Sequence, residues 1–380
     1  MSVNSSSIPP NGSTPNLTDC ANAKDYVTDF GYFFVRWAHL ITGSVILLLL
    51  LNISVFIAKK PNLPLHGNLK LLLLNVLFLY SIFALSYLIT SVRYLFIFAT
   101  FSDPCQCLTP IWLAFLLRMP AYVYLVASPL FHFGIMVERV RATIFVGKYE
   151  REGIKCGIGI TIFMWLLAVL FSTYIVITAF ADTVTFSKPL VYLSMTTSFN
   201  AQVFINIHYF FLFLVICVAL ADYLLIKLNK LAIQRAKNKV MPYNLSRSYQ
   251  AKENIVTIRL LFPLDFSYTL FFTIFIISSA FVRFYKDEMS LLVYNRAYEG
   301  IQLILSMHAI ISLSTYLYFL KRSRGQSAEE LTVAQRTREH FRVLQSQWKF
   351  EEAQPKNEEA FIRGIIAARR RDERGKMNEK

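Results

Sequence analysis

Seven segments of the chain are long, apolar and nearly free of charge, which restricts the chain to few folds. A helix that crosses a bilayer needs roughly 20 consecutive apolar residues, since it must pair its backbone polar groups within itself. In addition, 55% of the residues are hydrophobic and only 17% are charged, an unusual balance for a soluble domain. We therefore expect an all-α membrane protein with a bundle of seven transmembrane helices. The segments are 37–58, 71–92, 111–137, 157–181, 203–226, 260–282 and 301–320.

The basic residues predict the orientation of this bundle. Of the 39 Lys and Arg residues, 31 fall on one side of the seven segments, seven fall on the other, and Arg118 lies within the third segment. Lys and Arg in short loops are held in the cytoplasm. We therefore expect the N-terminus outside and the C-terminus in the cytoplasm, with the transmembrane domain covering 36–320. The basic residues are spread over several loops, which argues against a nucleic-acid partner.

Residues 1–35 are predicted to form an extracellular polar tail. Sequons for N-glycosylation occur at Asn4, Asn11 and Asn16, and they can be used only if the tail reaches the lumen. The tail has no basic start followed by an apolar core, so we expect the first hydrophobic segment to act as a signal anchor.

Three cysteines fall on the oxidising side in this orientation: Cys20, Cys105 and Cys107. They allow one disulfide and leave one thiol. We expect Cys20 to pair with Cys105 or with Cys107. The alternative is that the last two thiols are free or paired with each other.

Arg118 is the first candidate for a ligand-binding residue. A charge within a span usually faces the bundle interior, where it would favour a small anionic or strongly hydrogen-bond-accepting molecule. The alternative is that its long side chain reaches the outer headgroups. His208 and His308 are further candidates, although a lone His in a span often serves as a helix-to-helix hydrogen bond. We expect no metal site and no cofactor, because these residues lack the spacing of metal ligands.

The stretch "MVERVRATIFVGKYE" (136–150) places a dense ionic patch where the third segment ends. Arg139 at this depth is costly unless a carboxylate receives it. Asp265 and Asp222 lie at a similar predicted depth in other segments. We therefore consider a latch between Arg139 and Asp265 that would part on activation. The alternative is that Asp265 caps the start of its own helix, near Pro263.

Three separated blocks carry a family resemblance. "ERVRATIFVGKYE", "YNLSRSYQAKENIVTIRLL" and "EHFRVLQSQW" resemble, in the right order, motifs of nematode serpentine chemoreceptors. The last block is most similar to the class epsilon (Sre) family, and the class alpha and alpha-beta families are the nearest alternatives. The first two motifs match at Glu138, Arg139, Ala142, Thr143, Tyr149 and Glu150, and at Leu245, Ser246, Tyr249, Gln250, Glu253 and Asn254.

This resemblance implies a G-protein-coupled chemoreceptor in the plasma membrane of sensory neurons, in their cilia. It implies a small-molecule cue, a heterotrimeric G protein as partner, and coupling residues around Glu138, Arg139, Tyr149 and Glu150. The seventh segment reads "SMHAIISLSTYLYFL" and lacks the Asn-Pro-x-x-Tyr motif of rhodopsin-type receptors. The activation switch is therefore not expected to copy theirs in every part.

Residues 321–380 are predicted to form a cytoplasmic tail. Ser327 and Glu330 form a capping box, and the apolar residues that follow predict an amphipathic helix over about 327–350 that contacts membrane lipids. The sequence contains no Gly-x-Ser-x-Gly, HExxH or phosphate-loop motif, so we do not expect an enzyme. The alternative to a receptor is a channel or transporter of seven-helix type, against which the lack of an obvious inverted repeat argues.

Overall fold

The computed structural model of the 380-residue chain describes the bundle and its connections. The described residues are 16–59, 66–145, 149, 153–182, 186, 188–197, 199–237, 245–322 and 363–364. The chain divides into two compact units, Met1–Leu317 and Tyr318–Lys380. The predicted sequons at Asn4 and Asn11, the coupling residue Glu150 and the amphipathic helix at 327–350 all lie outside the described residues.

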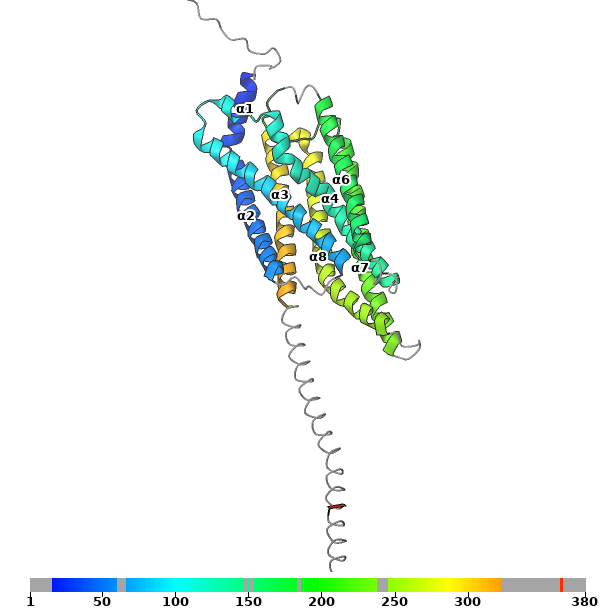
Figure 1. The fold of residues 1–380 in the computed structure, drawn as a ribbon. Coiled ribbons are helices and arrows are strands. Elements are labelled where there is room, and N and C mark those ends of the chain that lie inside the picture. Colours follow the sequence, from blue (N-terminus) through cyan, green and yellow to red (C-terminus); the bar gives the residue numbers. More distant parts are fainter. Residues whose placement is uncertain are drawn as a thin grey trace, which may run out of the picture. The chain divides into compact units, whose positions relative to one another are not determined.

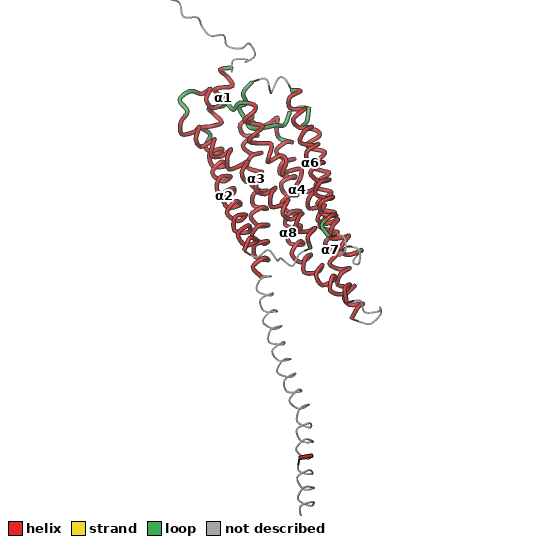
Figure 2. The backbone as a smooth tube through the Cα atoms, in the orientation of Figure 1, coloured by secondary structure: helices red, strands yellow, loops and turns green. Residues whose placement is uncertain are grey.

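Seven helices are long and apolar enough to cross a membrane, which confirms the predicted fold class. Figures 1 and 2 show these helices side by side. They extend beyond the predicted apolar segments because the helical hydrogen bonding continues past the apolar stretch. The helices are α2 (Phe30–Lys59), α3 (Gly67–Thr100), α4 (Ile111–Ile144), α6 (Lys155–Ala181), α7 (Ala201–Lys237), α8 (Leu245–Phe284) and the seventh span, Leu291–Arg322.

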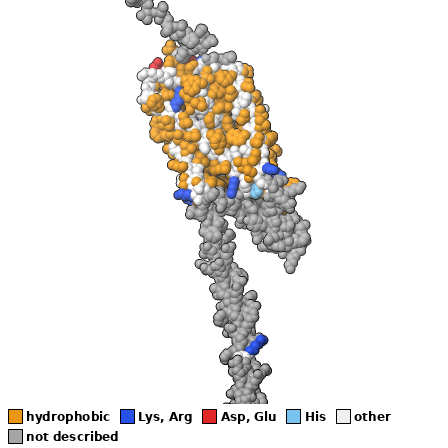
Figure 3. All heavy atoms as spheres, in the orientation of Figure 1, with side chains coloured by type: hydrophobic (Ala, Val, Ile, Leu, Met, Phe, Trp, Pro, Cys, Tyr) orange, Lys and Arg blue, Asp and Glu red, His pale blue; other side chains and the backbone are white. Residues whose placement is uncertain are grey.

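Helix α4 lies at the centre of this bundle. It packs against α3, α6, α7 and α8, and α2 and α3 also pack together. Half of the apolar window of α3 and of α4 is buried inside the bundle, against 17% in α2 and α6. The outer helices therefore expose most of their apolar side chains, which form the hydrophobic surface in Figure 3. Such a surface suits a lipid environment.

The tail contains a helix that the sequence analysis did not predict. Helix α1 (Leu17–Thr28) begins after Asn16, whose side chain accepts a hydrogen bond from the Thr18 backbone N–H at 3.4 Å. Cys20 and Tyr26 of α1 are buried against α2, α3 and the 3-10 helix η1 (Pro104–Cys107). Within the tail predicted over 1–35, the structure thus forms α1 and the start of α2.

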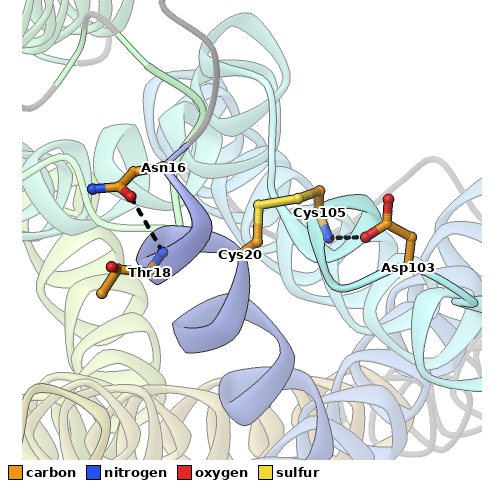
Figure 4. Close-up of a disulfide and its surroundings, with 5 residues drawn as sticks. All are labelled: Asn16, Thr18, Cys20, Asp103 and Cys105. Carbon is orange, nitrogen blue, oxygen red and sulfur yellow. Dashed lines mark hydrogen bonds between the residues drawn. A yellow bond between two sulfur atoms is a disulfide. The ribbon is translucent and has the colours of Figure 1, made fainter.

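The structure joins Cys20 to Cys105 by a disulfide, one of the two pairings expected with Cys20 (Figure 4). Cys107 remains a free thiol and is buried. Burial raises the pKa of this thiol above its usual value. The disulfide fastens α1 to the connection between α3 and α4.

The segment between α6 and α7 folds back over the same end of the bundle. Thr109 and Leu190 form an isolated antiparallel bridge, with backbone hydrogen bonds of 2.9 and 2.8 Å. Lys188 Nζ lies 2.7 Å from a carboxylate oxygen of Asp19 in α1. The two outer segments and α1 thus form a connected cover.

Candidate functional site

Beneath this cover, Arg118 of α4 points into the bundle. Its side chain is only 7% exposed, and its guanidinium pairs with the carboxylate of Glu299 in the seventh span. Its Nε donates a hydrogen bond of 2.9 Å to the carbonyl oxygen of Leu193. Arg118 therefore faces the bundle interior, which is one of the two predicted alternatives.

A second arginine shares the same carboxylate. Arg36 of α2 is fully buried, and its Nη1 lies 3.3 Å from Glu299 Oε2. Arg36 also donates a hydrogen bond of 2.8 Å to the hydroxyl of Tyr26 in α1. One carboxylate thus faces two guanidiniums, so the cluster Arg36–Glu299–Arg118 carries a net charge of +1.

Arg36 was not among the predicted site residues, because it precedes the apolar segment 37–58 and was counted as a flanking charge. A signal was present at helical spacing. Tyr32, Arg36 and His39 are buried on one face of α2, and they recur at intervals of three and four residues.

A pocket with an empty volume of about 510 Å³, part of it open to solvent, adjoins this cluster. Arg118 and Glu299 line it, and the guanidinium carbon of Arg118 lies 5.3 Å from the centroid of the Tyr87 ring. Aromatic walls with a few fixed polar groups are typical of small-molecule sites. The remaining polar lining residues are Tyr32, Tyr122, Tyr192, Ser194, Asn295, Tyr298 and Gln302.

The other two predicted ligand-binding residues lie elsewhere. His308 Nε2 and the Tyr80 hydroxyl are hydrogen-bonded at 3.1 Å, which is the helix-to-helix bond considered as the alternative. His208 lines a different cavity, between α7 and α8. The structure therefore does not bring Arg118, His208 and His308 into one site.

The middle of the bundle holds a buried polar cluster. His132 of α4 pairs with Asp265 of α8, and the Tyr268 ring stacks on the His132 ring with centroids 4.1 Å apart. Asp222 of α7 is 2% exposed. A cavity with an empty volume of about 430 Å³, its open side included, is lined by His132, Asp265 and Tyr80 and mostly by apolar residues. The sequence analysis missed His132, since a lone His on a helix carries no distinctive pattern.

The predicted ionic patch is present at the opposite end of α4. Arg139 Nη2 donates hydrogen bonds to Glu138 Oε1 at 2.6 Å and to the Tyr149 hydroxyl at 3.0 Å. Tyr149 in turn donates to Glu138, and its ring packs on His66 with centroids 4.2 Å apart. Burial raises the pKa of Tyr149 well above its usual value, so its hydroxyl keeps its proton and remains a donor.

The latch between Arg139 and Asp265 requires correction. Arg139 pairs with Glu138, the neighbouring residue, and Asp265 pairs with His132. His132 lies seven residues before Arg139, two helical turns deeper on the same face of α4. The carboxylate of Asp265 meets α4 at the depth of the histidine, so a different pair of residues joins α4 and α8.

The seven helices and the covered polar pocket at one end define a receptor-like membrane protein. A family model described as serpentine type 7TM GPCR receptor class ab chemoreceptor matches residues 18–349, and the chain belongs to this family. The match supports the predicted group of nematode serpentine receptors. The matching family, class ab, is one of the nearest alternatives named above, and the match gives no support to class epsilon. No curated protein is a significant match to the chain.

Proposed function

We propose that this chemoreceptor binds a small anionic molecule in the pocket beside Arg118 and signals to a heterotrimeric G protein. The proposal depends mainly on one observation: Arg36 and Arg118 are buried and share the single carboxylate of Glu299. A buried cation without a full counter-charge is costly, and an anionic ligand would supply that charge.

The orientation with the N-terminus outside supports this proposal. It places the pocket, α1 and the sequon at Asn16 on the extracellular side, where dissolved cues arrive. Asn16 is exposed at the start of α1 and is accessible for glycosylation. The same orientation places Glu138, Arg139 and Tyr149 on the cytoplasmic side, where we propose that they form part of the surface read by the G protein. The plasma membrane of sensory cilia is the expected location.

A continuous series of aromatic contacts supports transmission from the pocket to the middle of the bundle. The series begins in the pocket and ends at the pair of His132 and Asp265, with neighbouring ring centroids 4.1 to 6.1 Å apart. Packed side chains with two alternative arrangements can carry coupling between distant sites. We propose that ligand binding repacks this series and changes the contact between α4 and α8. The rings are, in order, Tyr87, Phe83, Tyr124, Tyr80, His308, Tyr268 and His132.

A signalling assay with a ligand panel tests the proposal. The receptor would be expressed in cultured cells with a promiscuous Gα subunit and a calcium readout, and exposed to small carboxylates and to their neutral amides. We expect responses to carboxylates only. Arg118→Gln should raise the half-maximal concentration of an active carboxylate at least about 30-fold, which equals about 2 kcal/mol, because truncating one partner of a buried charge pair costs that much or more.

Arg93→Gln is the matched control. Arg93 lies near the same end of α3, is half-buried, and donates to the Thr109 hydroxyl at 3.0 Å without lining the pocket. The half-maximal concentration of the active carboxylate should change less than threefold in this variant. Equal responses to amides and carboxylates at normal surface expression would contradict the anionic ligand. A ligand-gated current that persists with G proteins disabled would instead indicate a channel.

A further inference from the structure

A second cavity lies between α7 and α8 and shares no lining residue with the pocket of Arg118. Its empty volume is about 650 Å³, with its open side included. His208 of α7 and Ser279 of α8 contribute polar atoms to its lining.

Both polar side chains are buried, and each has one polar atom without a partner, although the His208 ring also bonds the backbone of Phe204. His208 is 5% exposed and Ser279 is 4% exposed. Within the part of the chain that the structure describes, neither His208 Nε2 nor Ser279 Oγ makes a hydrogen bond. Buried polar groups in proteins are nearly always hydrogen-bonded, so these two atoms indicate a polar ligand group between the helices.

Arg283 adds a positive charge to the same cavity. It lies in the last turn of α8, and its nearest partner is Tyr298, whose hydroxyl lies 3.5 Å from Nη2. Its guanidinium carbon also lies 5.7 Å from the centroid of the Tyr298 ring. No carboxylate among the described residues forms an ion pair with Arg283. The polar ligand group is therefore expected to be anionic.

The rim of the cavity is apolar and exposed. Tyr209 is 53% exposed and Phe284 is 81% exposed, and both belong to the apolar outer surface of α7 and α8. In a bilayer this surface faces acyl chains, so the cavity can be reached from the lipid. Ile205 and Ile276 line the cavity with further apolar surface.

We propose that this cavity binds a single-chain amphiphile with an anionic head, such as a lipophilic carboxylic acid, which enters from the outer leaflet. The carboxylate accepts hydrogen bonds from Arg283 and Ser279, and the chain passes between Tyr209 and Phe284 into the bilayer. This proposal does not depend on the ligand assigned to the Arg118 pocket, because it concerns binding and not signalling.

Photolabelling of the full-length receptor in nanodiscs tests the proposal. The probe is palmitate with a diazirine in its chain, and labelled peptides are identified by mass spectrometry. We expect saturable labelling of peptides from α7 and α8. Unlabelled palmitate should compete, whereas hexadecanol, which has the same chain and no charge, should not. Phosphatidylserine in the nanodisc should compete weakly, since two chains and a large head exceed the cavity.

The variants sharpen this test. Arg283→Gln should weaken apparent affinity for the probe at least tenfold, and Ser279→Ala should weaken it about threefold. Arg93→Gln and Ser172→Ala are the matched controls, because they alter a half-buried arginine and a buried, unpartnered serine outside the cavity, and they should bind as the wild type does.

Several outcomes would overturn the proposal. These are labelling that does not saturate, labelling equal in Arg283→Gln and wild type, equal competition by hexadecanol, or competition by phosphatidylserine alone, which would assign the cavity to a diacyl lipid. If Arg283→Gln elutes as an aggregate, Ser279→Ala carries the test, with its threefold loss of affinity and the same controls.

Discussion

Replacing Glu299 with glutamine removes the carboxylate that two buried arginines share. Arg36 would keep its hydrogen bond to Tyr26, and Arg118 would keep its bond to Leu193, but neither charge would be balanced. Breaking a buried ion pair by removing one partner costs about 3–5 kcal/mol. We expect a loss near 3 kcal/mol, because both guanidiniums retain a hydrogen-bond acceptor.

Thermal unfolding of the purified receptor measures this loss. In a Cys156→Ser/Cys217→Ser background, a thiol-reactive dye reports unfolding, because the remaining free thiol, Cys107, is buried in the native protein and its pKa is raised by burial. Unfolding entropy is roughly 2.1 cal/mol/K per residue, so a loss of 3 kcal/mol in a bundle of about 300 residues lowers the Tm by roughly 5 °C. Glu288→Gln is the matched control, since Glu288 is exposed in the 3-10 helix η2 (Lys286–Glu288) and should leave the Tm unchanged.

The double variant Arg118→Gln/Glu299→Gln completes the cycle. It removes one positive and one negative charge, so it should be more stable than the sum of the single changes predicts, by about 0.5–3 kcal/mol. If Glu299→Gln unfolds within 2 °C of the wild type, or if the two single losses add, the buried charge cluster is not the constraint that we describe.

Three further predictions follow from other contacts. Tyr149→Phe should raise basal signalling up to about tenfold, because losing hydrogen bonds to charged groups costs about 1.5 kcal/mol. The control Tyr223→Phe changes an exposed tyrosine and should leave basal signalling unchanged. An unchanged basal rate in Tyr149→Phe would show that Tyr149 does not restrain activation. Cys105→Ser should lower the free energy of unfolding by about 2–4 kcal/mol, as measured with the receptor in detergent, whereas Cys107→Ser should have a small effect; the reverse order would contradict the observed pairing. Asp265→Asn should raise basal signalling at normal surface expression, because it weakens the tie between α4 and α8; a basal rate equal to that of the wild type would show that this tie does not restrain activation.

The seven spans could be predicted because hydropathy is a local property of the sequence, and about 20 residues are enough to identify a span. Helix α1 could not be predicted in this way. Its buried residues, among them Cys20 and Tyr26, are apolar partners only after the bundle has formed around them. Its start carried a weaker local signal, with Asn16 at the cap position and Asp19 in the first turn.

The site was predictable in part for a related reason. The cost of burying a charge in a span marks Arg118 as a candidate, whatever its partner. The partner, Glu299, lies on the last helix, and nothing local in the sequence connects the two residues. The same limit explains the latch, because it was predicted from the similar depths of Arg139 and Asp265 along their segments, and a sequence does not give the depth at which two helices meet.

The disulfide between Cys20 and Cys105 has a consequence for biosynthesis. The two cysteines are 85 residues apart, and α2 and α3 lie between them. The bond can close only after both helices have been threaded through the membrane, since a single crossing would leave the sulfurs in different compartments. Formation of the disulfide therefore indicates that α2 and α3 were inserted in the correct orientation. In a molecule inserted in the opposite orientation, both thiols would lie in the cytosol and stay reduced.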